Sequence, residues 1–124
     1  METLHVKATS RTPEIIFNPS INSFSIKGKF FPENIKDFLI PILDWLENYK
    51  NSKAKSIELQ CQIDYLSSSS VIYLKQIFLK FSEFKAVGTE INVLWYYDED
   101  DEDIRKTGEY YVKNSNLNFI FKEN

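Results

Sequence analysis

Four consecutive serines, from Ser67 to Ser70, stand between a segment of alternating polarity and a segment with a helical period. A serine hydroxyl at the start of a helix can cap it, because the oxygen accepts a hydrogen bond from an amide with no partner inside the helix. A hydroxyl at an exposed turn is also open to a kinase, and the free amides and dipole there suit a phosphate. Capping one helix requires only one serine, so it leaves the other serines of the run unexplained. We therefore keep two interpretations of this run, a helix cap and a regulatory phosphorylation site.

An acidic stretch from Asp98 to Asp103 is the second feature that could carry chemistry. Its spacing partly matches a calcium-binding loop, with carboxylates at positions one, three, five and twelve, which are Asp98, Asp100, Glu102 and Glu109. Two features do not fit such a loop. Asp103 falls at the sixth position, where the loop needs a glycine, and the acidic stretch follows a predicted strand, whereas a calcium-binding loop follows a helix. A metal-dependent enzyme or a calcium-binding protein stays an alternative, but we expect no metal. The favoured interpretation is a solvated first helical turn, since carboxylates there complement the helix dipole.

Residues for nucleophilic catalysis are few in this chain. The only histidine, His5, lies far in sequence from the only cysteine, Cys61, whose place on the apolar side of a strand is typical of a core residue. The three glycines are scattered and form no phosphate-binding loop. We therefore expect no cofactor and a protein that is not an enzyme, with acid–base chemistry by carboxylates left open.

Three adjacent aromatic residues, Trp95, Tyr96 and Tyr97, end a segment that has the pattern of a strand. Neighbouring residues of a strand point to opposite faces, so at least one of these rings lies away from the helix-covered side. Exposed aromatic side chains are frequent anchors of protein interfaces. The run therefore predicts a contact with another protein.

Composition narrows the class of partner. The 124 residues carry a formal net charge of -3, whereas nucleic acids and anionic membranes require a concentrated basic surface. The first residues are charged where a secretory signal needs an apolar stretch, and no segment approaches about 18 consecutive apolar residues. A lone cysteine excludes an internal disulfide, as expected in a reducing compartment. We expect one cytoplasmic domain, residues 1–124, that binds neither nucleic acid nor membrane and has another protein as its partner.

Periodicity predicts the elements that position these residues. Alternating polarity predicts strands near 4–8, 24–27, 56–65, 90–97 and 118–121. Apolar residues three and four apart predict amphipathic helices at 35–49 and 71–84, and a third after the acidic stretch that carries Ile104, Tyr111 and Val112. Gly88 can cap the end of the second helix. The order is β-β-α-β-α-β-α-β, a single α/β domain.

The segment from Ser56 to Tyr65 has the clearest pattern. Apolar residues, including Tyr65 at its end, alternate with polar ones along its whole length, so one face is buried and the other is solvated. A sheet covered on both faces needs strands that are apolar throughout. We therefore expect a mixed β-sheet with helices packed mainly on one face, and this strand at its centre.

In combination, five short motifs resemble the SiaC family of bacterial regulatory phosphoproteins, and the resemblance covers nearly the whole chain. The motifs are Thr12-Pro13, Pro32-Glu33-Asn34, Asp44-Trp45-Leu46, the run Tyr65-Leu66 followed by Ser67 to Ser70, and Trp95-Tyr96-Tyr97-Asp98-Glu99-Asp100. The resemblance implies a fold like that of the STAS domains of anti-sigma-factor antagonists. It also implies partner switching with a serine/threonine kinase, a metal-dependent phosphatase and an output protein, of which a diguanylate cyclase is one example.

The same resemblance assigns a role to individual residues. The family's phosphoacceptor is the second residue after a Tyr-Leu pair, which carries over to Ser68, while Ser67 replaces the asparagine usual in the family. That departure makes four hydroxyls contiguous, so Ser67, Ser69 and Ser70 are alternative acceptors. The expected partner-binding residues are Tyr65, Leu66, Ser67, Ser69, Trp95, Tyr97 and Asp98. A constitutive binding scaffold, whose serines only cap a helix, is the second alternative function.

Overall fold

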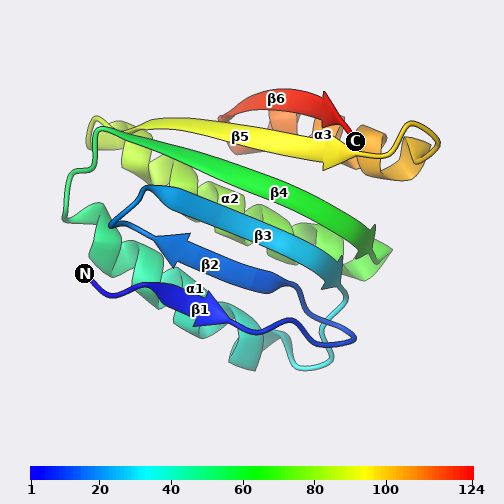
Figure 1. Ribbon diagram of the computed structural model, residues 1–124, viewed down its shortest axis with the longest axis horizontal. Coiled ribbons are helices and arrows are strands. Elements are labelled where there is room, and N and C mark those ends of the chain that lie inside the picture. Colours follow the sequence, from blue (N-terminus) through cyan, green and yellow to red (C-terminus); the bar gives the residue numbers. More distant parts are fainter.

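A computed structural model describes residues 1–124 and contains six strands and three α-helices (Figure 1). The strands are β1 (Leu4–Val6), β2 (Glu14–Asn18), β3 (Ser23–Phe30), β4 (Ser56–Leu66), β5 (Glu90–Tyr97) and β6 (Asn118–Glu123). The helices are α1 (Ile35–Lys50), α2 (Val71–Ala86) and α3 (Glu102–Ser115), and a single 3-10 turn, Ser68–Ser70, leads into α2. None of the three helices combines the length and apolar character needed to cross a bilayer.

The six strands form one sheet in the order β1-β2-β3-β4-β5-β6. The pairs β1–β2 and β2–β3 are antiparallel, whereas β3, β4, β5 and β6 run parallel to one another. Helices α1, α2 and α3 connect the parallel strands, and Figure 1 shows all three behind the same face of the sheet. The predicted fold class, a mixed α/β sheet with helices on one face, is confirmed.

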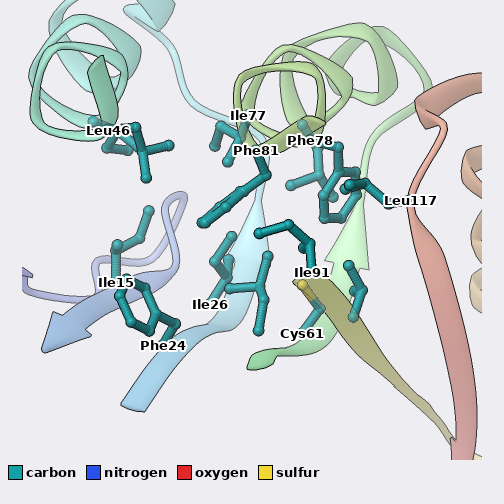
Figure 2. Close-up of a cluster of buried hydrophobic side chains, with 14 of the residues drawn as sticks. Ile15, Phe24, Ile26, Leu46, Cys61, Ile77, Phe78, Phe81, Ile91 and Leu117 are labelled. Carbon is teal, nitrogen blue, oxygen red and sulfur yellow. The ribbon is translucent and has the colours of Figure 1, made fainter. Parts of the chain in front are cut away.

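The core lies between the sheet and the helices. Leu59, Cys61 and Ile63 of β4 are buried on the helix side, as the alternating pattern predicted, while Glu58 on the same strand is exposed. Cys61 belongs to a cluster of 24 buried apolar residues, and Figure 2 shows its side chain beneath those of α2. Strand β4 pairs with β3 and β5 and is therefore central in the sheet.

Two local features of α2 are the glycine that follows its C-terminal end and the ion pairs that it forms with α1. The helix ends at Ala86, and Gly88, which was predicted to cap it, follows the C-cap residue Val87 with a φ of 93°, a left-handed conformation that costs glycine little. Farther along its surface, an ionic network joins α2 to α1: Lys50 and Lys80 each contact both Glu47 and Glu83 at 2.8 to 3.5 Å. The two carboxylates are exposed and the two lysine side chains are about 20% exposed, so solvent still screens the network, and we expect it to orient the two helices more than it stabilises the fold.

Two expectations about the fold are wrong. The predicted order has two strands before the first helix, whereas the structure has three, because Glu14–Asn18 forms β2. Its apolar residues are consecutive and do not alternate, so the two-residue period was absent: Ile15 and Phe17 face the core, and Ile16 lies on the uncovered face. Val112 was expected in the core of α3 but is exposed, one position beyond the buried Tyr111.

Candidate functional site

The predicted site residues gather at one end of the sheet. Parallel strands end at the same edge, so the serine run after β4 and the acidic loop after β5 lie at neighbouring positions there. Figure 1 shows the ends of β4 and β5 at this edge, together with the C-terminus. A hollow of about 270 Å³ lies between the two strand ends and is lined by Gln62, Ile63, Asp64, Tyr96, Tyr97, Asp98, Asp101, Ile104 and Asn124.

The serine run forms the link from β4 to α2. The amide of Ser67 donates to the carbonyl oxygen of Phe30 at 3.3 Å, which extends the β3–β4 pairing by one residue. The hydroxyl of Ser67 donates to that of Ser70 at 2.7 Å, and Ser70 is only 3% exposed. Neither side chain caps a helix. The capping interpretation is therefore wrong, because these two hydroxyls bind each other.

Ser68 and Ser69 are the exposed members of the run. The Ser69 hydroxyl lies 3.4 Å from that of Ser67, whereas the Ser68 hydroxyl takes part in no side-chain hydrogen bond of the turn. Both serines precede the first amides of α2, which have no partner inside the helix. Ser68 and Ser69 therefore carry the two accessible hydroxyls of the run, and that of Ser68 has fewer side-chain hydrogen bonds.

Tyr65 lies on the uncovered face of the sheet, contrary to its predicted place in the buried row of β4. The register with β3 shifts between Gly28, which pairs with Ile63, and Lys29, which pairs with Tyr65. One extra residue, Asp64, is thus inserted in β4, and such a bulge reverses the faces of all residues that follow. Tyr65 becomes 51% exposed as a result, next to the serine turn.

Leu66 faces the opposite way to Tyr65. It pairs with the buried Phe30 and packs, partly buried, against the core. Its side chain therefore packs on the core side of the sheet, next to the serine turn, and offers a partner little surface.

An aromatic and cationic stack adjoins Tyr65 on the uncovered face. The ring of Phe31 meets that of Tyr65 edge to face, with centroids 5.3 Å apart. The guanidinium of Arg11 lies 5.0 Å from the centroid of Phe31, and its Nε is 3.1 Å from a carboxylate oxygen of Glu33. Neither Arg11 nor Phe31 was predicted as a site residue, although the adjacent pair Phe30-Phe31, which has one ring on each face of the sheet, is a signal that the sequence contains.

Trp95 cannot contact a partner in this structure, and its assignment to the partner-binding residues is wrong. Its side chain is 0% exposed, and its Nε1 donates to the carbonyl oxygen of Ile104 at 3.0 Å. Trp95 continues the inward-facing row of Ile91 and Val93, a period of two that the sequence displays. Tyr96, the neighbour that the prediction did not select, lies on the uncovered face and lines the hollow.

Tyr97, the last residue of β5, and Asp98, which follows it, line the hollow. The ring of Tyr97 is half-buried between Phe121, with centroids 6.3 Å apart, and the guanidinium of Arg105 at 5.9 Å. The carboxylate of Asp98 is exposed and accepts a hydrogen bond from the side chain of Asn124 at 3.0 Å. Both residues present polar atoms at the same edge of the sheet as the serine turn.

The acidic stretch starts α3. Asp101 is the N-cap residue, and its carboxylate accepts a hydrogen bond from the amide of Ile104 at 3.1 Å. Glu102 and Asp103 occupy the first turn, where negative charge complements the helix dipole. No three carboxylates of the chain converge as ligands for a metal ion would.

Helix α3 is also attached to the start of α2, directly after the serine turn. The phenolic hydroxyl of Tyr111 donates to the carbonyl oxygen of Val71 at 2.7 Å. Burial, with a smaller contribution from neighbouring Tyr110, raises the pKa of Tyr111 far above its usual range, so the donor stays protonated. This bond fixes the first residue of α2 and, through it, the geometry of the turn.

An apolar groove runs between the N-terminal halves of α1 and α2. It has a volume of about 520 Å³ and is lined by Ile35, Lys36, Leu39, Ile40, Leu43, Tyr73 and Gln76. Tyr73 belongs to the first turn of α2, so the groove begins beside the serine turn. Exposed Ile40 and Ile72 add apolar surface to the two helices that border it.

The side chains examined for nucleophilic chemistry lie elsewhere. Cys61 is fully buried in the core, and burial raises the pKa of its thiol well above the usual range. His5 lies on β1 near Glu14, with 3.5 Å between its Nε2 and a carboxylate oxygen. His5 on β1 and Cys61 on β4 lie on strands that are not neighbours in the sheet, as their distance in sequence suggested.

Comparison with known proteins decides the family. The family model described as SiaC family regulatory phosphoprotein matches residues 6–124. This chain belongs to the SiaC family. An uncharacterised protein of Pseudomonas aeruginosa strain UCBPP-PA14 is 25% identical over 122 residues, which are 98% of this chain and 97% of that protein.

Solved structures of SiaC proteins show the same fold. SiaC of Pseudomonas aeruginosa superposes with a TM-score of 0.87 at 23% identity, covering all of both chains. A crystal structure of the diguanylate cyclase SiaD in complex with its activator SiaC, from the same organism, contains a chain with a TM-score of 0.87 at 24% identity, covering 98% of this chain and 99% of that one. This chain therefore shares the fold of SiaC from Pseudomonas aeruginosa.

Proposed function

We propose that this SiaC-family protein is a cytoplasmic binding module controlled by phosphorylation of Ser68. Unmodified, the surface around Ser68 docks an output protein, and the phosphorylated form releases it. The observation that carries this proposal is the state of the Ser68 hydroxyl, which is exposed and free of side-chain hydrogen bonds at the start of α2. Ser70 is buried and bonded to Ser67, which makes Ser69 the remaining alternative acceptor.

The docking surface has an apolar part and a switchable part. The groove between α1 and α2 supplies apolar area, and Tyr65 supplies an exposed ring on the other side of the serine turn. When Ser68 Oγ takes the γ-phosphoryl group of a nucleoside triphosphate, its hydroxyl proton leaves and the diphosphate is released. The surface then gains a charge of about -1.5 to -2 at neutral pH. A charge of that size beside a desolvated apolar contact opposes docking.

The proposed partners are a serine/threonine kinase that adds the phosphate, a metal-dependent phosphatase that removes it, and a diguanylate cyclase as output. The complex of SiaD with its activator SiaC supports the choice of a diguanylate cyclase. All three partners need access to Ser68, so we expect them to compete. The burial of Cys61 and the use of Asp101 as a helix cap support a role in binding over one in catalysis.

Site mapping tests the proposal. The purified protein is incubated with ATP and an extract of the native cells, and phosphate is located by mass spectrometry. We expect label on Ser68 in the wild type and in Ser69→Ala, and loss of most label in Ser68→Ala. Near-ultraviolet circular dichroism shows that each variant is folded. Phosphate found only outside Ser67–Ser70, or undiminished label in Ser68→Ala, would overturn the proposal.

A further inference from the structure

The chain has only two arginines, Arg11 and Arg105, and one of them lies near the serine turn. Arg11 follows β1 in the connection to β2, which Figure 1 shows at the same end of the sheet as the end of β4. Its guanidinium rests on the ring of Phe31 and contacts Glu33. The other arginine, Arg105, lies over Tyr97 on α3 and contacts Glu109.

Backbone hydrogen bonds bring Arg11 close to the turn. Phe31 donates its amide to the carbonyl oxygen of Arg11 at 2.8 Å, and Ser67 donates its amide to the carbonyl oxygen of Phe30 at 3.3 Å. The end of β3 is thus the only chain segment between Arg11 and Ser67. Hydrogen-bonded neighbours lie about 4.8 Å apart, so the two backbones are about 10 Å apart. The extended side chains of arginine and phosphoserine together span such a gap.

We propose that Arg11 binds the phosphoryl group of phosphorylated Ser68 and so forms an intramolecular phosphate site. The inference rests on the proposed phosphorylation of Ser68. A guanidinium offers paired N–H donors that match two phosphate oxygens, which makes arginine the best side chain for this task. The positive end of the α2 dipole, next to the serine turn, also favours a negative charge at this position.

The present partner of Arg11 is easily exchanged. The ion pair with Glu33 is exposed, with half of the arginine side chain and 73% of the glutamate side chain accessible to solvent. Exposed pairs contribute little stability, whereas a phosphate has more charge and more acceptor oxygens than a carboxylate. Phe31 keeps the guanidinium near the turn through a cation–π contact. Phosphorylation therefore moves Arg11 from Glu33 to Ser68 and changes the surface beside Tyr65 as well as the turn.

Protein with phosphoserine incorporated genetically at position 68 tests this site directly. The pKa of the phosphate is measured by phosphorus NMR in the wild type, in Arg11→Gln and in the matched control Arg105→Gln. We expect the wild type and the control to have a phosphate pKa lower by about half a pH unit or more than that of Arg11→Gln, because a nearby cation favours the dianion. Arg11→Lys should recover part of the difference. Equal values in all proteins would overturn the inference.

The NMR signal of the Arg11 guanidinium gives a second readout. We expect its Nε–H resonance to shift in the phosphorylated protein and that of Arg105 to stay in place. Because the phosphate is incorporated without a kinase, these results do not depend on which serine the cell modifies. Site mapping that excludes Ser68 would refute the proposed function and leave the phosphate site measurable, whereas an unchanged pKa in Arg11→Gln would refute only the site.

Discussion

Gly108 lies where α3 passes over the buried ring of Trp95. A Cβ atom at this position would lie 2.5 Å from Nε1 of Trp95 and 2.8 Å from Cε2 of Phe121. Both rings are held by other contacts: Nε1 of Trp95 donates to Ile104, and Phe121 packs on Tyr97. The glycine is therefore required for the close approach of helix and sheet, in a helix that would otherwise favour alanine.

Gly108→Ala should destabilise the protein by about 1 to 3 kcal/mol, because the added methyl group forces Trp95 or the helix to shift. The sign of the change in stability is informative, since replacing glycine by alanine in a helix with free space around it stabilises the protein by about 0.5 to 1 kcal/mol. Urea unfolding measures the difference, with Lys106→Ala on the exposed side of α3 as the control. A more stable Gly108→Ala protein would contradict the packing described for α3.

Residue-level errors in the sequence predictions concern the face on which a side chain lies. Trp95 and Tyr97 follow the inward row of β5, and the two-residue period was sufficient to place them and to select Tyr96 as the outward ring. Tyr65 is different, because its face depends on the bulge at Asp64, which no two-residue pattern contains. Such an inserted residue is fixed by pairing with β3, a contact distant in sequence.

At the scale of elements, the acidic stretch has a structural role in α3. Asp101 caps the helix through the amide of Ile104, and Glu102 and Asp103 occupy its first turn. The next carboxylate toward the N-terminus, Asp100, is exposed and makes no side-chain hydrogen bond within the stretch. One carboxylate of the stretch therefore caps α3, and the others are solvated in or before its first turn.

Asp101→Ala should cost about 1 kcal/mol of stability, within a range of about 0.5 to 2, because the amide of Ile104 loses its partner. Asp101→Asn should keep most of the stability, since asparagine caps equally well, and Asp100→Ala should change it by less than about 0.5 kcal/mol. Chemical denaturation of the four proteins checks the order. Equal losses in Asp100→Ala and Asp101→Ala would show that net charge, not the cap, is what the stretch contributes.

Most elements were predictable from local pattern. The helices α1, α2 and α3 and the strand β4 occur where periodicity placed them, because each has a more apolar and a more polar face. Strand β5 also occurs where predicted, although the buried Leu94 interrupts its alternation. Strand β2 was missed because Ile16 faces away from the core next to two buried neighbours, which removes the alternation. The serine turn was located correctly, but the pairing of Ser67 with Ser70 requires the three-dimensional turn and has no signal in four identical residues.

At the scale of the whole molecule, topology brings the site together. Four parallel strands place the ends of β3, β4 and β5 at one edge, which gathers Phe31, the serine turn and the acidic loop. The hydroxyl of Tyr111 then ties α3 to Val71 at the start of α2, and α1 packs against α2. The opposite end of the sheet carries none of the predicted site residues.

The most direct test of the central claim is the affinity of the two forms for the output protein. The diguanylate cyclase of the same organism is titrated by calorimetry with unmodified protein and with protein carrying phosphoserine at position 68. The account predicts a Kd at least tenfold higher for the phosphorylated form, a difference of about 1.4 kcal/mol or more in binding free energy. Tight binding of the unmodified protein with a Kd that phosphorylation leaves unchanged would contradict it.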